Sequence, residues 1–250
     1  MTAPLLEVRE ISKAFEGLRA LDGISFQVPA GKVVSIIGPN GAGKTTLFNV
    51  ITGALAPSDG DVLFEGRSIR GLRPSQTARL GIGRTFQIVR PFPGLTTLEN
   101  VMLAALARER TRRAAQERAG RILELTGLAP LAGVPARQLT LARRKRLEVA
   151  RAVALQPKLV LLDEVMAGLT PAEVDETVEL VRALPSLGIA AVAGIEHVMQ
   201  AVQKISDWIV AVNFGRKLAE GPPAEVMRHP EVIKAYLGAR YAAGAARAAP

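Results

Sequence analysis

The sequence predicts an α/β fold built around a parallel sheet, and three observations support this. Apolar runs at 33–37, 159–162 and 188–195 have the length and composition of strands that are buried on both faces. A glycine-rich segment at 38–46 joins the first run to a stretch with apolar residues at helical spacing. Between 88 and 156 the strand signal gives way to helix, which predicts a helical insertion in the α/β core.

The N-terminal part is expected to contribute short strands. Residues 8–15 and 24–28 predict a hairpin, because two strand-like runs are separated by turn residues. Residues 56–61 combine Pro, Gly and Asp and predict a turn that leads to a strand at 62–64. Another strand is expected at 83–87, before a proline-containing segment that prevents regular pairing.

The predicted insertion begins with a helix near Thr97, for which Thr96 or Thr97 is a suitable cap. Residues 100–155 are expected to be entirely helical. The stretch 104–124 carries many Arg and Glu residues on an alanine-rich background, typical of an exposed helix with charge pairs. A nucleic-acid role is the alternative, but no interleaved aromatic residues are present to stack on bases.

The C-terminal part returns to strands and short helices. A strand pair is expected from 208–212 with a turn near 213–215, followed by helices at 223–229 and 232–237. A low-complexity, disordered tail is predicted for 239–250.

We expect one domain over 1–238. Its core would comprise 1–87 and 157–238, and the helical subdomain would occupy about 88–156.

The composition of the chain argues against several classes of protein. The chain has 250 residues, 48% of them hydrophobic, and no cysteine, which excludes a disulfide framework and a cysteine metal site. No apolar run approaches the roughly 18 residues of a membrane-spanning helix, and the N-terminus lacks the pattern of a secretory signal. The formal net charge of +9 fits a nucleic-acid or anionic-membrane partner, or a solvated basic surface.

The segment 38–46 carries the strongest functional signal. It fits Gly-x-x-x-x-Gly-Lys-[Ser/Thr], the P-loop pattern, between a strand and a helix. Backbone N–H groups and the helix N-terminus favour phosphate there, Lys44 is expected to reach the terminal phosphates, and Thr45 to bind Mg²⁺. An ordinary glycine turn is the alternative. The predicted nucleotide-binding residues are Gly38, Pro39, Asn40, Gly41, Ala42, Gly43, Lys44, Thr45 and Thr46.

Two carboxylates follow the apolar strand at 159–162. Asp163 is expected to bind Mg²⁺ and Glu164 to activate or orient the attacking water, as in a Walker B motif. The carboxyl end of a parallel strand would place both at the edge of the sheet that also holds the P-loop. The alternative is a strand that ends in solvated acids.

His197 follows another predicted strand, at a position suited to hydrogen-bond the γ-phosphate or the attacking water. Its alternative is a capping or surface histidine.

These motifs together resemble those of an ABC-transporter ATP-binding subunit over about residues 5–238. The resemblance implies a P-loop ATPase core with an antiparallel β subdomain and an inserted helical subdomain. It implies that Gln87 contacts Mg²⁺ and the attacking water, that His197 is the switch histidine, and that Phe15 stacks on adenine. A buried core phenylalanine is the alternative for Phe15.

More narrowly, the chain is similar to the branched-chain amino acid transport ATP-binding subunits. The similarity lies in segments outside the shared catalytic motifs: Gly83–Gln87, Leu98–Val101, Ala167–Leu169, Ile195–His197 and Val232–Gly238.

The signature segment departs from the family pattern Leu-Ser-Gly-Gly-Gln, because the aligned residues are Leu-Thr-Leu-Ala-Arg at 139–143. Thr140 keeps the hydroxyl that would contact ATP in the partner's site. Leu141 and Ala142 replace both glycines, which would hinder backbone approach, and Arg143 offers a compensating charge. We therefore expect an intact ATP half-site and a weakened signature offered to the partner.

The resemblance implies an ATP- and Mg²⁺-dependent ATPase of an importer for branched-chain or other small amino acids. Its expected partners are transmembrane permease subunits, a second ATPase subunit that is the same or homologous, and, indirectly, a solute-binding protein. No specific nucleic acid is expected, and the expected location is peripheral, on the cytoplasmic face of the cell membrane. A lipid or lipopolysaccharide export ATPase, a soluble non-transport ABC ATPase and a non-hydrolysing regulator are the alternatives.

Overall fold

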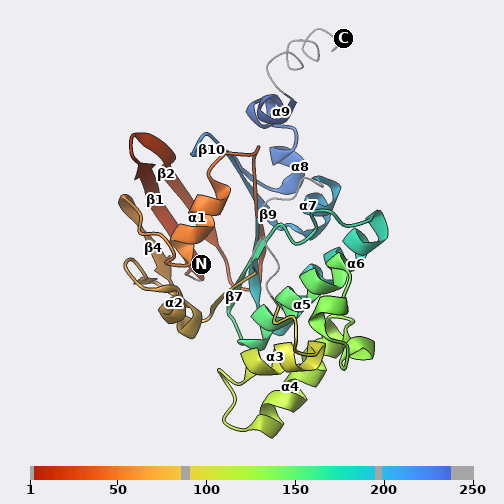
Figure 1. The fold of residues 1–250 in the computed structure, drawn as a ribbon. Helices are drawn as coiled ribbons and strands as arrows, with labels where there is room; N and C mark the ends of the chain where they lie inside the picture. The colour runs from red at the N-terminus through yellow and green to blue at the C-terminus, as the bar shows by residue number, and fades with distance from the viewer. Residues whose placement is uncertain (1–2, 86–90, 195–198, 238–250) are drawn as a thin grey trace.

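The computed structural model describes residues 3–85, 91–194 and 199–237. A central parallel sheet separates an antiparallel sheet on one side from a group of helices on the other (Figure 1). The predicted α/β class is therefore confirmed.

The central sheet has six strands in the order β10-β9-β3-β8-β7-β6. All of its strands are parallel except β10, which pairs antiparallel with β9 at one edge. Their bounds are β3 (Val33–Ile37), β6 (Ile82–Arg84), β7 (Leu159–Asp163), β8 (Ala190–Gly194), β9 (Trp208–Asn213) and β10 (Arg216–Gly221).

Alternating side chains of the central strands pack into two different cores. In β7, Leu159 and Leu161 join the core shared with the antiparallel sheet and α1, whereas Val160 and Leu162 join the core shared with the inserted helices. Because both faces of the strand are covered, its first four residues are apolar, and the only polar side chain is that of Asp163 at the carboxyl end.

The second sheet is antiparallel, in the order β2-β1-β4-β5. It contains β1 (Leu6–Phe15), β2 (Leu18–Val28), β4 (Asp59–Phe64) and β5 (Arg67–Ser68). The turn expected at 56–61 is wrong in its second half, because Asp59 and Asp61 pair with Ser12 and Arg9 of β1. Pairing with a neighbouring strand extends β4 through residues whose own preference is for a turn.

The inserted segment contains α3 (Thr97–Ala105), α4 (Arg112–Leu125) and α5 (Leu141–Ala154). Thr96 caps α3, as expected, since its side chain accepts a hydrogen bond from the Glu99 backbone N–H. The prediction of unbroken helix from 100 to 155 is wrong. Gly127 adopts a left-handed φ of 66° after α4, and only short 3₁₀ turns with prolines connect α4 to α5.

The remaining helices surround the central sheet. Their bounds are α1 (Lys44–Ile51), α2 (Pro74–Leu80), α6 (Pro171–Ala183), α7 (Met199–Ile205), α8 (Pro223–Val226) and α9 (Pro230–Leu237). Of these helices, α2, α6 and α7 were not predicted from the sequence. Within the described ranges, no helix is long and apolar enough to cross a membrane.

Candidate nucleotide site

A pocket of about 820 Å³ opens at the N-terminus of α1. It brings together predicted residues from distant parts of the chain: the P-loop, Phe15 and Glu164. The lining residues are Phe15, Leu18, Arg19, Ala20, Asn40, Gly41, Ala42, Gly43, Lys44, Thr45, Thr46, Glu164 and Phe214.

Two glycines allow the loop to pack closely against its surroundings. A Cβ atom at Gly38 would lie 2.1 Å from the Val212 carbonyl oxygen, and one at Gly43 would lie 2.5 Å from the Ala20 carbonyl oxygen. Gly43 also has a φ of 99°, a conformation that side-chain-bearing residues rarely adopt. These contacts fix the loop between β9 and β2, at the start of α1.

Lys44 directs its ammonium group back into the loop. Its Nζ donates hydrogen bonds of 2.6 Å to the carbonyl oxygens of both Gly38 and Pro39. Burial lowers the pKa of Lys44, and the negative charges of Glu164 and Asp163 oppose this shift. An anionic ligand in the pocket would therefore give a partly desolvated cation a compensating charge.

Asp163, at the end of β7, is held by two neighbours: Arg84, the last residue of β6, and Thr85, which follows it. Arg84 Nη2 donates a 3.0 Å hydrogen bond to Asp163 Oδ2, and Thr85 Oγ1 accepts one of 3.0 Å from the Asp163 backbone N–H. Arg84 is itself oriented by Asn49 of α1, whose Oδ1 accepts a 2.7 Å hydrogen bond from Nη1. Desolvation raises the pKa of Asp163, and the Arg84 contact opposes it.

The oxygen atoms at this position fit a magnesium ion. Asp163 Oδ1 is buried and has no hydrogen-bond partner among the described residues, while Thr45 is exposed in the pocket. Carboxylate and hydroxyl oxygens suit Mg²⁺, which takes few protein ligands and completes its coordination with phosphate and water. Accordingly, the described residues contain no group of three or more acidic, His or Cys side chains that would form an all-protein metal cage.

Glu164 has an unusual backbone conformation that the α5 helix stabilises. Its φ is 49°, in the left-handed region, which is costly for a residue with a side chain. Lys145 of α5 donates 2.6 Å hydrogen bonds to the carbonyl oxygens of Glu164 and Ala167. The inserted helices thus hold the turn that presents the Glu164 side chain to the pocket.

Some predicted site residues are not part of the pocket lining: Gly38, Pro39 and Asp163 lie within two positions of lining residues in the sequence but do not line the pocket themselves. Gln87 and His197 fall outside the described residues. Thr140 is the N-cap of α5, where its exposed side chain accepts a hydrogen bond of 3.4 Å from the Arg143 backbone N–H, and it does not line the pocket.

Several residues that shape the site were not predicted from the sequence. Arg84, Thr85 and Asn49 orient Asp163, and Lys145 holds Glu164. No short motif identifies them, because each acts through a contact between residues that are far apart in the chain. The sequence does hold one signal: Asp163 ends a strand that is apolar up to that point, and a buried carboxylate needs a basic or hydrogen-bonding neighbour.

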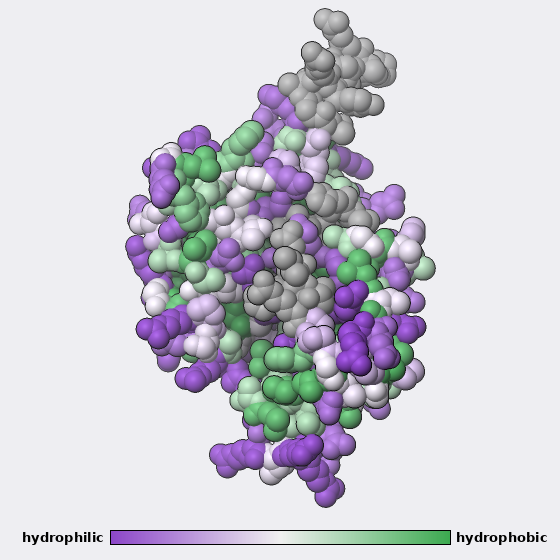
Figure 2. Space-filling view, viewed as in Figure 1, coloured by the Kyte–Doolittle hydropathy of each residue, from purple (hydrophilic) through white to green (hydrophobic). Residues whose placement is uncertain are grey.

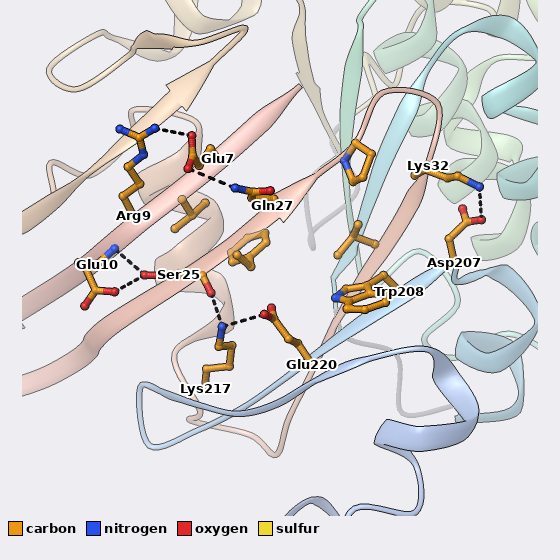
Figure 3. A pocket seen from close by; sticks show the side chains of 14 residues that line it. Glu7, Arg9, Glu10, Ser25, Gln27, Lys32, Asp207, Trp208, Lys217 and Glu220 are labelled. Carbon is orange, nitrogen blue, oxygen red and sulfur yellow. Dashed lines mark hydrogen bonds and ion pairs between the residues drawn. The ribbon is translucent and has the colours of Figure 1, made fainter. Parts of the chain in front are cut away.

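A second pocket of about 810 Å³ lies between the two sheets, at the opposite ends of the strands (Figure 3). Six of its seven charged side chains form ion pairs, namely Glu7 with Arg9, Lys32 with Asp207, and Lys217 with Glu220, and Glu10 accepts a hydrogen bond from the Ser25 hydroxyl. These pairs leave its charges directed at one another and not at a common point in the cavity, which distinguishes this pocket from the one at the P-loop.

Family models match two parts of the chain. The model described as ABC transporter matches residues 21–167, and the model described as Branched-chain amino acid ATP-binding cassette transporter matches residues 216–242.

Among curated relatives, the high-affinity branched-chain amino acid transport ATP-binding protein BraF of Pseudomonas aeruginosa is 41% identical over 95% of this chain and 99% of its own. The corresponding LivG protein of Escherichia coli is 40% identical with the same coverage.

Solved structures agree in fold. The ADP conformation of MJ1267, an ATP-binding cassette of an ABC transporter, has a TM-score of 0.86 at 33% identity and covers 95% of this chain and 100% of that one. A dimeric post-hydrolysis state of the cassette MJ0796, bound to ADP and Pi, has a TM-score of 0.78 at 25% identity, over 87% and 98%. The chain belongs to the ABC transporter family of ATP-binding cassettes, among the branched-chain amino acid transport ATP-binding proteins.

Proposed function

We propose that this ATPase drives an importer of branched-chain amino acids, with Mg–ATP bound at the P-loop pocket. The arrangement that carries the proposal is the meeting of Lys44 and Glu164 in one pocket, with the buried Asp163 directly before Glu164 and close enough for its charge to act on Lys44. The names of the relatives support the amino-acid substrate.

Each residue has a proposed role. The P-loop N–H groups and Lys44 bind the phosphates, while Phe15 stacks on the base. Thr45 and Asp163 hold Mg²⁺, which would neutralise charge on the phosphates. Glu164 orients or deprotonates the attacking water, and Gln87 and His197 act on the same water and on the γ-phosphate.

We further propose that the site is completed by a second ATPase subunit, whose signature segment faces this P-loop. The dimeric MJ0796 structure supports this arrangement. Thr140 and the N-terminus of α5 would act in the same way on the partner's ATP. Closure of the dimer would exclude water and position the γ-phosphate for attack.

The inserted helices offer a surface for the permease subunits. Figure 2 shows a hydrophobic patch over α3, where Leu103 and Leu106 are 47% and 43% exposed. Phe92, which precedes α3, is 46% exposed. We propose that a permease helix docks here on the cytoplasmic face of the membrane, and that a solute-binding protein delivers the amino acid on the other side.

The test is a Glu164→Gln variant in the complex assembled with its membrane subunits. We expect ATP turnover to fall by about 100-fold or more while ATP binding persists, because the variant loses the base but keeps the phosphate site. Glu179→Gln is the matched control, since Glu179 is exposed on α6. Turnover near wild type in the Glu164 variant would refute the assignment.

Co-purification from detergent extracts tests the partners. We expect permease subunits to be retained with the chain. A combined Leu103→Ser and Leu106→Ser variant should lose them without losing ATP binding.

A further inference from the structure

Phe214 is the most exposed large hydrophobic residue among those described, with 84% of its surface accessible. It lies between β9 and β10 and lines the nucleotide pocket. The other aromatic residue that lines this pocket is Phe15, which is 41% exposed and belongs to β1. Two solvent-exposed rings from different sheets therefore border the same cavity.

The backbone at Phe214 is unfavourable for an aromatic residue. Asn213 pairs with Arg216, so Phe214 and Gly215 form a two-residue hairpin turn, with φ values of 44° and 75°. Such turns favour Asn or Gly at the first position, because a bulky side chain is strained at positive φ. Folding alone therefore disfavours Phe at this position, through both strain and exposure.

The turn is fixed relative to the P-loop. The Gly215 backbone N–H donates a 3.0 Å hydrogen bond to the Ala42 carbonyl oxygen, and the Gly215 carbonyl accepts one of 2.8 Å from the Asp22 N–H. Arg216 adds a 2.6 Å ion pair with Asp22. The turn that carries Phe214 is thus held against the P-loop and β2, and its ring borders the pocket without needing a large backbone movement.

We propose that Phe214 is a nucleotide-contacting residue that packs on the purine base of ATP as a second aromatic wall, in addition to Phe15. This inference rests on the proposed function, because it assumes that the P-loop pocket binds ATP. Stacking on an aromatic ring recognises any base face, so its loss should weaken the binding of nucleotides and leave the binding of a bare phosphate chain unchanged.

The experiment compares the affinities of the full chain for Mg–ATP and for inorganic triphosphate by calorimetry. In Phe214→Asn we expect ATP to bind roughly tenfold more weakly, while triphosphate binding and the melting temperature do not fall, since Asn suits the turn. Phe214→Trp should retain ATP affinity. Leu187→Asn is a control for loss of an exposed apolar side chain, because Leu187 is 50% exposed and borders a different pocket.

The outcomes separate this inference from the proposed function. ATP affinity unchanged in Phe214→Asn overturns the inference, as does an equal loss of ATP and triphosphate binding. An effect confined to ATP-dependent dimerisation would assign the ring to a subunit interface and also overturn it. Lys44→Ala should weaken both ligands, and failure of the wild-type chain to bind either ligand would contradict the proposed function itself.

Discussion

Arg84 and Asp163 form an ion pair at the carboxyl ends of β6 and β7, with side chains only 12% and 1% exposed. Both charges are largely removed from water, and the ion pair offsets part of the cost of that desolvation. Asp163 keeps a second oxygen without a hydrogen-bond partner in the described structure, and that atom is available to a metal. The pair thus holds the carboxylate in place at the end of β7.

Replacing Arg84 by Gln should destabilise the ligand-free protein by about 3 kcal/mol or more, because the variant leaves a buried carboxylate without its cation. In thermal unfolding this corresponds to a melting temperature lower by about 10 °C. Millimolar Mg²⁺ should restore part of the loss by supplying positive charge at Asp163.

Arg9→Gln is the control for this prediction, since the Arg9–Glu7 pair is exposed, with side chains 56% and 21% accessible. Its effect on the melting temperature should be much smaller, because solvent screens the pair. Equal effects of the two substitutions would show that the buried pair contributes no more than a surface pair.

The N-terminus of α5 combines a functional segment with a structural one. Thr140 caps the helix, Leu141 is 44% exposed, and Ala142 is buried. One turn further on, Lys145 hydrogen-bonds the turn that carries Glu164. Lys145 therefore links the first turns of α5 directly to the turn that carries Glu164.

Restoring the family signature with Leu141→Gly, Ala142→Gly and Arg143→Gln should raise ATP turnover in the assembled complex, because the backbone can then approach the partner's γ-phosphate. The same change should lower stability by up to about 1 kcal/mol for each glycine. Steady-state ATPase activity and thermal unfolding measure the two effects.

The restored variant also loses the positive charge of Arg143. Arg121→Gln removes one positive charge from an exposed position on α4 and therefore serves as the control for that loss. Turnover that stays at the wild-type value in the restored variant would contradict the hypothesis of a weakened signature.

The nucleotide pocket is lined by parts of the chain that are far apart in the sequence. The antiparallel sheet contributes Phe15, the P-loop and α1 contribute Lys44 and Thr45, and the end of β7 leads to Glu164. Because these parts meet only in the folded state, ATP binds the native chain in preference to the unfolded one.

For Glu164→Gln, an ATP concentration about 100 times Kd should therefore raise the free energy of unfolding by about 2.7 kcal/mol. In a domain of this size the melting temperature should rise by about 5–10 °C. Thermal unfolding with and without EDTA measures the contribution of Mg²⁺, and the further substitution Lys44→Ala should abolish most of the shift. A melting temperature that does not respond to ATP would contradict nucleotide binding at this pocket.

The sequence alone determined the features that depend on neighbouring residues. The P-loop spacing, the apolar strand before Asp163 and Glu164, and the cap at Thr96 are local patterns, and the described structure places each in the predicted element. The local pattern also gave one wrong prediction. Residues 59–61 have the composition of a turn, but they belong to β4 because they pair with β1.

Only the tertiary structure decided which side chains support the site. Arg84 and Asp163 are 79 positions apart, and the parallel pairing of β6 with β7 brings their strand ends together. Lys145 reaches the turn of Glu164 because α5 packs beside β7, and Phe214 borders the pocket because β9 lies next to β3. These contacts arise from sheet order and helix packing, which a single sequence does not encode in any short, readable spacing.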